Sequence, residues 1–244
     1  MDILLELRAV HTHVGAYHLL HGVDLLVPRG EVTMLLGRNG AGKTTTLRTI
    51  MGLWRASAGE LRLAGRPIGA LATPEIARAG IAYVPENMGI FTDLSVRENM
   101  VLAARAARHA GELDAQRLDW ILGLFPALRR FWLQRAGGLS GGQKQMLAVA
   151  RAIIEPRELL LIDEPSKGLA PAIVDNLVEA LGELKRDGAT VLLVEQNLGV
   201  ARALGDRVAV MDDGRVVHTG GMAEFAADGA LQQRLLGLAL RSAA

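Results

Sequence analysis

Short runs that are apolar at every position recur along the chain. They cover Val32 to Leu36, Ile81 to Val84, Leu159 to Ile162 and Val191 to Val194. Strands buried on both faces show this pattern, because helices cover both sides of a parallel sheet. Segments with helical spacing alternate with these runs. The pattern therefore predicts an α/β fold built on a mostly parallel sheet.

Two segments between the runs carry helix signals. Ser95-Val96-Arg97-Glu98 has the form of a capping box, and Val96, Met100 and Ala103 or Ala104 follow on one face. Pro171 suits the first turn of another helix, in which apolar side chains recur at helical spacing until Gly188 ends it. Residues 95–135 show no strand pattern. We therefore expect a helical subdomain at about residues 90–155.

The N-terminal part follows a different pattern. Residues 3–35 and Glu60 to Leu63 read as strands linked by turns, with Pro28-Arg29-Gly30 as one turn. An antiparallel β subdomain is therefore expected beside the parallel sheet. No internal repeat or low-complexity linker divides the chain, so we expect a single domain over residues 1–244.

Composition narrows the class of protein. Of the 244 residues, 50% are hydrophobic, which is enough for a sizeable core without covalent cross-links. The net charge of +1 gives no general attraction to nucleic acid or anionic lipid. The chain has no cysteine, which excludes disulfides and thiolate chemistry. Apolar runs fall far short of the ~20 residues of a membrane span, and no secretion signal is visible, so we expect a soluble intracellular protein.

One motif points directly to a ligand. Residues 37–44 match the phosphate-binding pattern G-x-x-x-x-G-K-S/T and lie between an apolar run and an apolar-periodic helix. Glycines let successive backbone N–H groups face phosphates, and the helix N-terminus adds partial positive charge. Lys43 can reach the β- and γ-phosphates, and the Thr44 hydroxyl can bind Mg²⁺. A glycine-rich turn with a solvated lysine is the plainer interpretation, which the flanking strand and helix disfavour. The predicted nucleotide-binding residues of this segment are Gly37, Arg38, Asn39, Gly40, Ala41, Gly42, Lys43, Thr44 and Thr45.

Two acids, Asp163 and Glu164, follow the run Leu159 to Ile162. They stand at the carboxyl end of a buried strand, where parallel sheets bind ligands. Asp163 suits a Mg²⁺ ligand, and Glu164 can orient or deprotonate an attacking water. A pair of helix-capping acids is the structural alternative, and the phosphate motif upstream favours the catalytic interpretation.

A third motif, Leu139-Ser140-Gly141-Gly142-Gln143, precedes a helix expected over about Lys144 to Ile154. Its N–H groups would lie at the positive end of that helix, which suits a second anion, although a Ser-capped helix is the plainer interpretation. With the phosphate loop, this LSGGQ motif and the acidic strand end in that order, the chain resembles the ATP-binding cassette (ABC) ATPases over nearly its whole length. A P-loop kinase or GTPase would leave LSGGQ unexplained.

The resemblance implies a P-loop ABC ATPase fold and hydrolysis of ATP with Mg²⁺. It also implies a head-to-tail dimer, formed with an identical chain or with a second ABC ATPase subunit. In such a dimer the LSGGQ motif of one subunit covers the ATP on the phosphate loop of the other. Ser140, Gly141 and Gly142 would then contact the γ-phosphate across the interface, and Gln143 completes the motif.

The finer resemblance is to the LivF-like ATPase subunits of branched-chain amino acid importers. It rests on residues 80–86, 163–171 and 192–197. The Q-loop position holds Glu86, a candidate metal ligand and coupling residue, and the D-loop aspartate position holds Ala170. The switch-histidine position holds Gln196, which can hydrogen-bond a γ-phosphate but cannot carry a proton to it. We count Lys43, Glu164 and Gln196 as the candidate catalytic residues.

The implied function is the ATPase of an importer for branched-chain or related amino acids or amides, bound peripherally at the cytoplasmic face of the membrane. Permease subunits and a periplasmic or extracellular substrate-binding protein would be separate chains, and no nucleic acid partner is expected. A soluble ABC ATPase acting on DNA or ribosomes is the alternative, but such proteins usually carry two cassettes or a long coiled coil. The family's adenine-stacking aromatic falls on Val14 here, so Tyr17, or else His13, is expected to stack on the base.

Two further clusters have competing interpretations. His11 and His13 share a strand face, with His18 and His21 nearby, but no acids stand at metal-ligand spacing. We therefore expect surface or loop histidines. The segment Arg129-Arg130-Phe131-Trp132 is compatible with nucleic-acid binding, but the low net charge favours docking to a membrane subunit.

Overall fold

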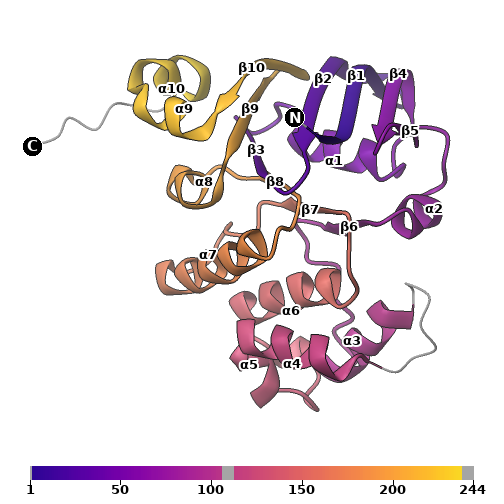
Figure 1. Ribbon diagram of the computed structural model, residues 1–244, viewed down its shortest axis with the longest axis vertical. Helices are drawn as coiled ribbons and strands as arrows, with labels where there is room; N and C mark the ends of the chain where they lie inside the picture. The colour runs from indigo at the N-terminus through magenta and orange to yellow at the C-terminus, as the bar shows by residue number, and fades with distance from the viewer. Residues whose placement is uncertain (1, 106–112, 238–244) are drawn as a thin grey trace, which may run out of the picture.

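The computed structural model describes residues 2–105 and 113–237, and its strands form two sheets (Figure 1). The antiparallel sheet has the order β2-β1-β4-β5 and comprises β1 (Ile3–Val14), β2 (Tyr17–Pro28), β4 (Ala56–Leu63) and β5 (Arg66–Pro67). The larger sheet has the order β10-β9-β3-β8-β7-β6 and comprises β3 (Val32–Gly37), β6 (Ile81–Val84), β7 (Leu159–Asp163), β8 (Val191–Val194), β9 (Arg207–Asp212) and β10 (Arg215–Gly221). Every pair in the larger sheet is parallel except β9 with β10. The predicted α/β fold is confirmed.

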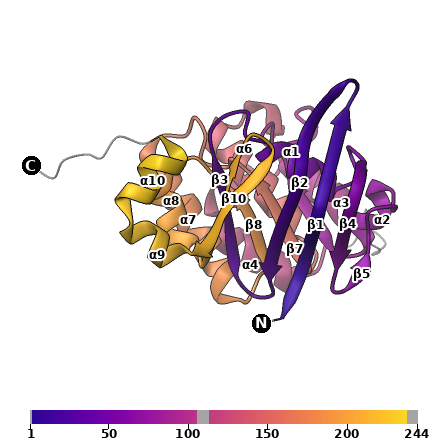
Figure 2. The ribbon, with the colours of Figure 1, turned by 90° about the horizontal axis from the view of Figure 1, so that it is seen from above.

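The helices divide into two groups. Those near the sheets are α1 (Lys43–Ile50), α2 (Thr73–Arg78), α7 (Pro171–Arg186), α8 (Leu198–Leu204), α9 (Met222–Ala227) and α10 (Gly229–Leu236). A second group lies together at the end of the molecule away from the antiparallel sheet, and consists of α3 (Val96–Arg105), α4 (Ala115–Leu124), α5 (Pro126–Arg130) and α6 (Gly141–Ile153) (Figure 1). Seen from above, α9 and α10 flank the molecule on the side opposite the antiparallel sheet (Figure 2).

The helical group falls within the predicted span of 90–155, although residues 106–112 lie outside the described residues. Between positions 95 and 135, the described residues contain no strand beyond an isolated bridge of Ser95 with Arg135. The predicted capping box is present, because Ser95 Oγ accepts from the Glu98 N–H at 3.2 Å and Glu98 accepts from the Ser95 N–H at 2.7 Å. The limits of the single predicted domain stay a prediction.

The all-apolar strands are explained by packing on both faces of the larger sheet. Successive side chains of a strand point to opposite faces. Met34 and Leu36 of β3 pack with the helices on one side, whereas Leu35 packs with Leu5 of the antiparallel sheet and Leu47 of α1 on the other. All are almost fully buried, and burial of each such side chain contributes about 1.5–3 kcal/mol. The end of β3, from which the phosphate loop departs, is therefore held rigidly.

One predicted helix boundary is wrong. The helix expected from Lys144 begins at Gly141, so the LSGGQ glycines form its first turn. The cause is a capping box: Ser140 Oγ accepts from the Gln143 N–H at 3.3 Å, and Gln143 Oε1 accepts from the Ser140 N–H at 2.9 Å. The predicted helix at Pro171 does begin there, and Gly188, with φ of +80°, follows its end.

Candidate active site

The phosphate motif forms the turn between β3 and α1. Gly37 has φ of +148°, and a Cβ at this position would overlap the carbonyl oxygen of Met211, so glycine is required. The loop curls around the side chain of Lys43, which is only 4% exposed. Lys43 Nζ donates to the carbonyl oxygens of Gly37 at 2.9 Å and Arg38 at 3.1 Å. The loop therefore presents a buried ammonium group at the start of α1.

The end of β7 brings two predicted metal ligands together. Thr44 Oγ1 donates to Asp163 Oδ1 at 3.1 Å, and the Tyr83 hydroxyl donates to Asp163 Oδ2 at 3.3 Å. Burial raises the pKa of Asp163, and the nearby charge of Glu164 adds to this, while the two hydrogen bonds act in the opposite direction. Burial, followed by the charge of Asp163, raises the pKa of Tyr83 to about 12, so its hydroxyl stays a donor.

This pair fits a Mg²⁺ ion chemically. A hydroxyl and a carboxylate already lie side by side, and both are oxygen ligands of the kind that Mg²⁺ prefers. Glu86, the third predicted metal ligand, differs. Among the described residues it makes no hydrogen bond to Thr44 or Asp163, and its side chain is 44% exposed.

Glu164 lies next to Asp163 in a strained backbone conformation, with φ of +47°. Its side chain is 7% exposed, and its carboxylate lies 3.6 Å from Lys43 Nζ and 3.3 Å from Lys167 Nζ. Gln196 Nε2 donates to Glu164 Oε1 at 2.6 Å. Burial acts to raise the pKa of Glu164, but the Gln196 hydrogen bond and the two lysine charges outweigh it, so this pKa is lowered. An ionised carboxylate is thus held at the strand end.

Gln196 connects this carboxylate to the phosphate loop. The same Nε2 atom that donates to Glu164 also donates to Asn39 Oδ1 at 2.8 Å. Gln196 follows β8, the neighbour of both β3 and β7, which explains how one amide reaches both partners. The predicted trio Lys43, Glu164 and Gln196 is therefore assembled in one place.

Three residues of the site were not predicted from the sequence. Lys167 donates to Glu86 Oε1 at 2.6 Å and also pairs with Glu164. Tyr83 contacts Asp163, as described above. Glu195 is 2% exposed and accepts from both the N–H and the hydroxyl of Ser166, at 3.0 and 2.9 Å. Only Glu195 had a usable signal, since it follows an all-apolar run as Asp163 does.

The LSGGQ residues lie elsewhere in the chain. They open α6 in the helical group, whereas the phosphate loop opens α1 beside the antiparallel sheet (Figure 1). Among the described residues, the side-chain hydrogen bonds of Ser140 and Gln143 serve only their own helix cap. Gly141 is exposed, and Gly142 lies so close to Ile173 of α7 that a Cβ would overlap it. One chain does not bring these residues to its own phosphate loop.

The hairpin of β1 and β2 borders the phosphate loop, because a Cβ at Gly42 would lie 3.1 Å from Leu20 Cδ2. At its tip, Tyr17 is 75% exposed. His13 is already engaged: its Nδ1 lies 2.8 Å from Ser57 Oγ, and its ring stacks on His18 at 4.0 Å between centroids. Of the two candidates for adenine stacking, Tyr17 is the one whose ring makes no stacking contact with the residues that the structure describes.

The four histidines of this cluster lie on strands β1 and β2 and not in loops, and His13 is exposed as expected for a surface residue. His11 Nδ1 is 3.0 Å from His18 Nε2, and the His18 and His21 rings lie 4.1 Å apart. Burial, followed by the charge of His18, lowers the pKa of His21. The described part of the chain contains no group of three His, Asp or Glu residues that could hold a metal ion.

Comparison with known proteins identifies the class. The family described as "ABC transporter" matches residues 20–167, and the chain belongs to this family. Its β-sheets and helices are those of an ABC ATPase: a solved "ATP binding subunit of ABC transporter" superimposes with a TM-score of 0.81 at 32% identity, over 93% of this chain and 94% of the other. The cassette MJ0796, solved as a dimer bound to ADP and Pi, gives a TM-score of 0.80 at 27% identity, over 90% and 99%.

Two relatives are more specific. The chain is 42% identical to the high-affinity branched-chain amino acid transport ATP-binding protein BraG of Pseudomonas aeruginosa, over 88% of this chain and 91% of BraG. It is 36% identical to the probable branched-chain amino acid transport ATP-binding protein LivF of Archaeoglobus fulgidus, over the same shares. The chain is thus an ABC-type, nucleotide-binding ATPase. No helix in the part of the chain that the structure describes is long and apolar enough to cross a membrane.

Proposed function

We propose that this protein is the ATP-hydrolysing subunit of an importer for branched-chain or related amino acids or amides. The observation that carries the proposal is the ionised Glu164, held by Lys43, Lys167 and Gln196 beside the Thr44–Asp163 pair. The transport named for BraG and LivF supports the importer over an ATPase acting on DNA or ribosomes. The whole chain, residues 1–244, would act as one ABC domain.

Nucleotide binding would use groups that form hydrogen bonds and ion pairs with one another in this structure. Lys43 would exchange its loop carbonyls and Glu164 for the β- and γ-phosphates of ATP. Thr44 and Asp163 would hold Mg²⁺, which when bound would neutralise phosphate charge. Glu164, freed from Lys43, would accept a proton from the attacking water. Gln196 would hold Glu164 in place and donate to the γ-phosphate, without moving a proton itself.

The second half of the site would come from another subunit. The N-terminus of α6, with Ser140, Gly141, Gly142 and Gln143, offers backbone N–H groups to an anion but faces no phosphate loop of its own chain. In a head-to-tail dimer it would cover the γ-phosphate held by the partner. The ADP-bound dimeric cassette MJ0796 supports this arrangement. Tyr17 would stack on the adenine.

Coupling to transport would run through Glu86. Its bond to Lys167, which also contacts Glu164, links the catalytic carboxylate to the segment that leads into the helical group. Permease subunits would dock on that group, where Leu133 is 79% exposed next to Arg129-Arg130-Phe131-Trp132. The protein would then lie at the cytoplasmic face of the membrane, and a separate substrate-binding protein would deliver the solute.

The test begins with partners and ends with uptake. Affinity-tagged protein purified from membranes should carry permease subunits with it, and the complex in vesicles should take up labelled leucine or a related solute when ATP is supplied. Uptake should require the matching substrate-binding protein. Purification with ribosomes or DNA, and without membrane proteins, would contradict the proposal and support the alternative.

A further inference from the structure

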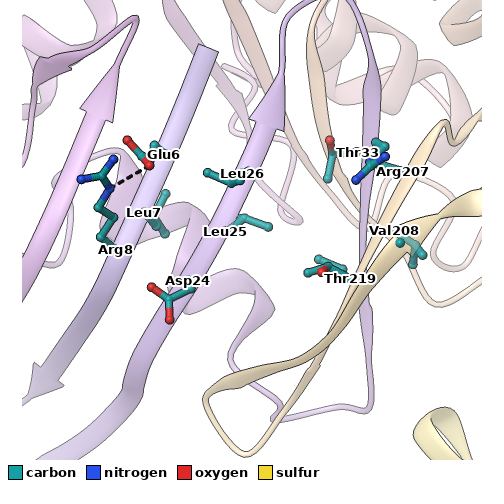
Figure 3. A pocket seen from close by; sticks show the side chains of 12 residues that line it. Glu6, Leu7, Arg8, Asp24, Leu25, Leu26, Thr33, Arg207, Val208 and Thr219 are labelled. Carbon is teal, nitrogen blue, oxygen red and sulfur yellow. Dashed lines mark hydrogen bonds and ion pairs between the residues drawn. The ribbon is translucent and has the colours of Figure 1, made fainter. Parts of the chain in front are cut away.

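A separate cavity of about 340 Å³ lies between the antiparallel sheet and strands β3, β9 and β10 (Figure 3). It is at the amino-terminal end of β3, where Thr33 lines it, whereas the phosphate loop leaves the opposite end of that strand. Leu7, Leu25 and Ala209 give it apolar surface. Its polar lining residues are Thr33, Thr219, Arg207, Arg8, Glu6 and Asp24. A cavity of this size that has both apolar and polar lining suits a small ligand with an apolar body and one polar end.

Thr33 and Arg207 define the polar end of the cavity. They are register partners on neighbouring parallel strands, so both side chains leave the sheet on the same face. Thr33 is 2% exposed, and its hydroxyl has no hydrogen-bond partner among the described residues. Buried hydroxyls in native proteins are usually hydrogen-bonded, so the Thr33 hydroxyl is available to bond to an atom placed in the cavity. Glu31, whose Oε2 is also buried without a partner, does not line the cavity.

The charges around the cavity leave one cation available. Arg8 is turned toward Glu6 and bonds to it at 2.7 Å (Figure 3), while Asp24 Oδ1 accepts from the Ala9 N–H at 2.8 Å. Within the described part of the chain, the guanidinium of Arg207 makes no hydrogen bond or ion pair. An unpaired guanidinium beside an unpaired hydroxyl selects an anion with two acceptor oxygens.

The apolar side of the cavity favours a ligand in which the anionic group is attached to an apolar body. Leu25 projects from β2 toward Thr33 and Thr219 across the cavity (Figure 3). Leu7, the register partner of Leu25 on β1, and Ala209 of β9 also line this side of the cavity. An inorganic anion would leave this side bare.

We propose that this cavity binds a small organic carboxylate with a short aliphatic body. The carboxylate accepts hydrogen bonds from Arg207 and Thr33, and the aliphatic body packs against Leu7, Leu25 and Ala209. The site uses none of the nucleotide-binding residues, so its failure would leave the proposed transport function untouched.

Calorimetry on the full chain tests the charge requirement, with 4-methylpentanoate as the probe. We expect saturable binding of the acid, and binding at least tenfold weaker for the uncharged amide of the same shape. Arg207→Gln should weaken binding of the acid roughly ten- to a hundredfold. The matched control is Arg62→Gln, which removes an arginine that pairs with Glu60 on β4 outside the cavity, and it should leave binding unchanged.

Thr33→Val tests the hydroxyl in a side chain of nearly the same shape. Affinity for 4-methylpentanoate should fall about two- to tenfold, and the melting temperature should not fall, because the lost hydroxyl has no partner in the protein. The proposal is overturned if the wild-type chain shows no saturable binding at millimolar acid. Equal affinity for acid and amide, or unchanged binding in Arg207→Gln, would overturn it as well.

Discussion

The phosphate loop and the start of α6 are both glycine-rich helix N-termini, yet their surroundings differ. At the loop, Lys43, Glu164 and Gln196 bond to one another and to the loop, and the key ammonium and carboxylate groups are buried. At α6, Ser140 is exposed and its side chain caps only its own helix. At the first terminus the charged side chains already contact one another, whereas at the second the described residues form only a helix cap. We call the first terminus the finished half of the proposed site and the second the unfinished half.

This difference separates two kinds of contribution to catalysis. In the finished half, the charged side chains of one chain contact one another. This half can therefore be tested by replacing one of these side chains at a time. The unfinished half can be tested only when two subunits meet. The predictions below are arranged accordingly, from the largest expected effect to the smallest.

Glu164→Gln should have the largest effect. The amide keeps the shape but cannot accept a proton, so the hydrolysis rate should fall by about 10²- to 10⁴-fold while ATP affinity stays within a few-fold of wild type. Steady-state phosphate release and nucleotide calorimetry measure the two quantities. Glu183→Gln on α7, an exposed acid paired with Arg186, is the matched control and should hydrolyse normally. Wild-type turnover in Glu164→Gln would move the base to another residue.

Lys43→Ala should break the finished half at the binding step. It removes the buried ammonium that would neutralise the β- and γ-phosphates, so ATP affinity should fall roughly ten- to a hundredfold. Calorimetry measures this directly, and thermal melting checks that the fold survives the change. Lys185→Ala, which removes a lysine paired with Asp206, should leave affinity unchanged. Unchanged affinity in Lys43→Ala would contradict the phosphate-loop assignment.

Mixing two defective chains tests the unfinished half. Ser140→Arg puts bulk and charge at the N-terminus of α6 but leaves that chain's own phosphate loop intact. In a head-to-tail dimer with Lys43→Ala, one composite site carries both defects and the other carries neither. With random pairing of equal amounts, half of the dimers are mixed and each has one intact site of two. The mixture should therefore recover up to about a quarter of wild-type hydrolysis, measured as phosphate release at fixed total protein. Normal hydrolysis by dilute, monomeric Ser140→Arg would contradict the composite site.

Glu86→Ala should separate transport from hydrolysis. Among the described residues, Glu86 is linked to the Glu164 carboxylate only through Lys167, and the side chains of Glu86 and Lys167 are about half exposed. The basal rate should therefore change by less than about threefold. Uptake by the reconstituted complex should fall further, because the link toward the helical group is cut. Equal loss of hydrolysis and uptake, or loss of neither, would count against coupling through Glu86.

The fold could be predicted where one physical cause acts locally. Strands with apolar side chains on both faces, such as Val191–Val194, predict a parallel sheet covered by helices. The pair Ser95 and Glu98 predicts the start of a helix. The positions of Asp163 and Lys43 followed from motifs whose mechanism requires a strand end and a helix start. The start of α6 was placed three residues too late, because two glycines argue against helix, but the interpretation of Ser140 as a helix cap is confirmed.

The remaining site residues depend on tertiary contact. Tyr83 and Asp163 are 80 positions apart and meet only because β6 pairs with β7. Lys167 gains its role from Glu86, 81 positions away, which no local pattern encodes. The stack of His13 on His18 likewise required the register of β1 with β2, since spacing alone indicated no more than a shared face.

Tyr83→Phe should give the smallest effect, seen in the pH dependence. Asp163 must be ionised to hold Mg²⁺, and burial raises its pKa. As the pH falls, metal-dependent activity should therefore be lost at a higher pH than it would be with an aspartate of ordinary pKa. The pKa of Glu164 is lowered, so its protonation comes later as the pH falls. Loss of the Tyr83 hydroxyl removes a donor that favours the Asp163 carboxylate, so the acid limb should move toward neutral pH. Activity near pH 8 should be unchanged, because Asp163 is ionised there in both proteins. Hydrolysis measured from pH 4 to 8 at low Mg²⁺ checks this, and an acid limb that stays in place or moves to lower pH would show that Tyr83 does not tune the metal ligand.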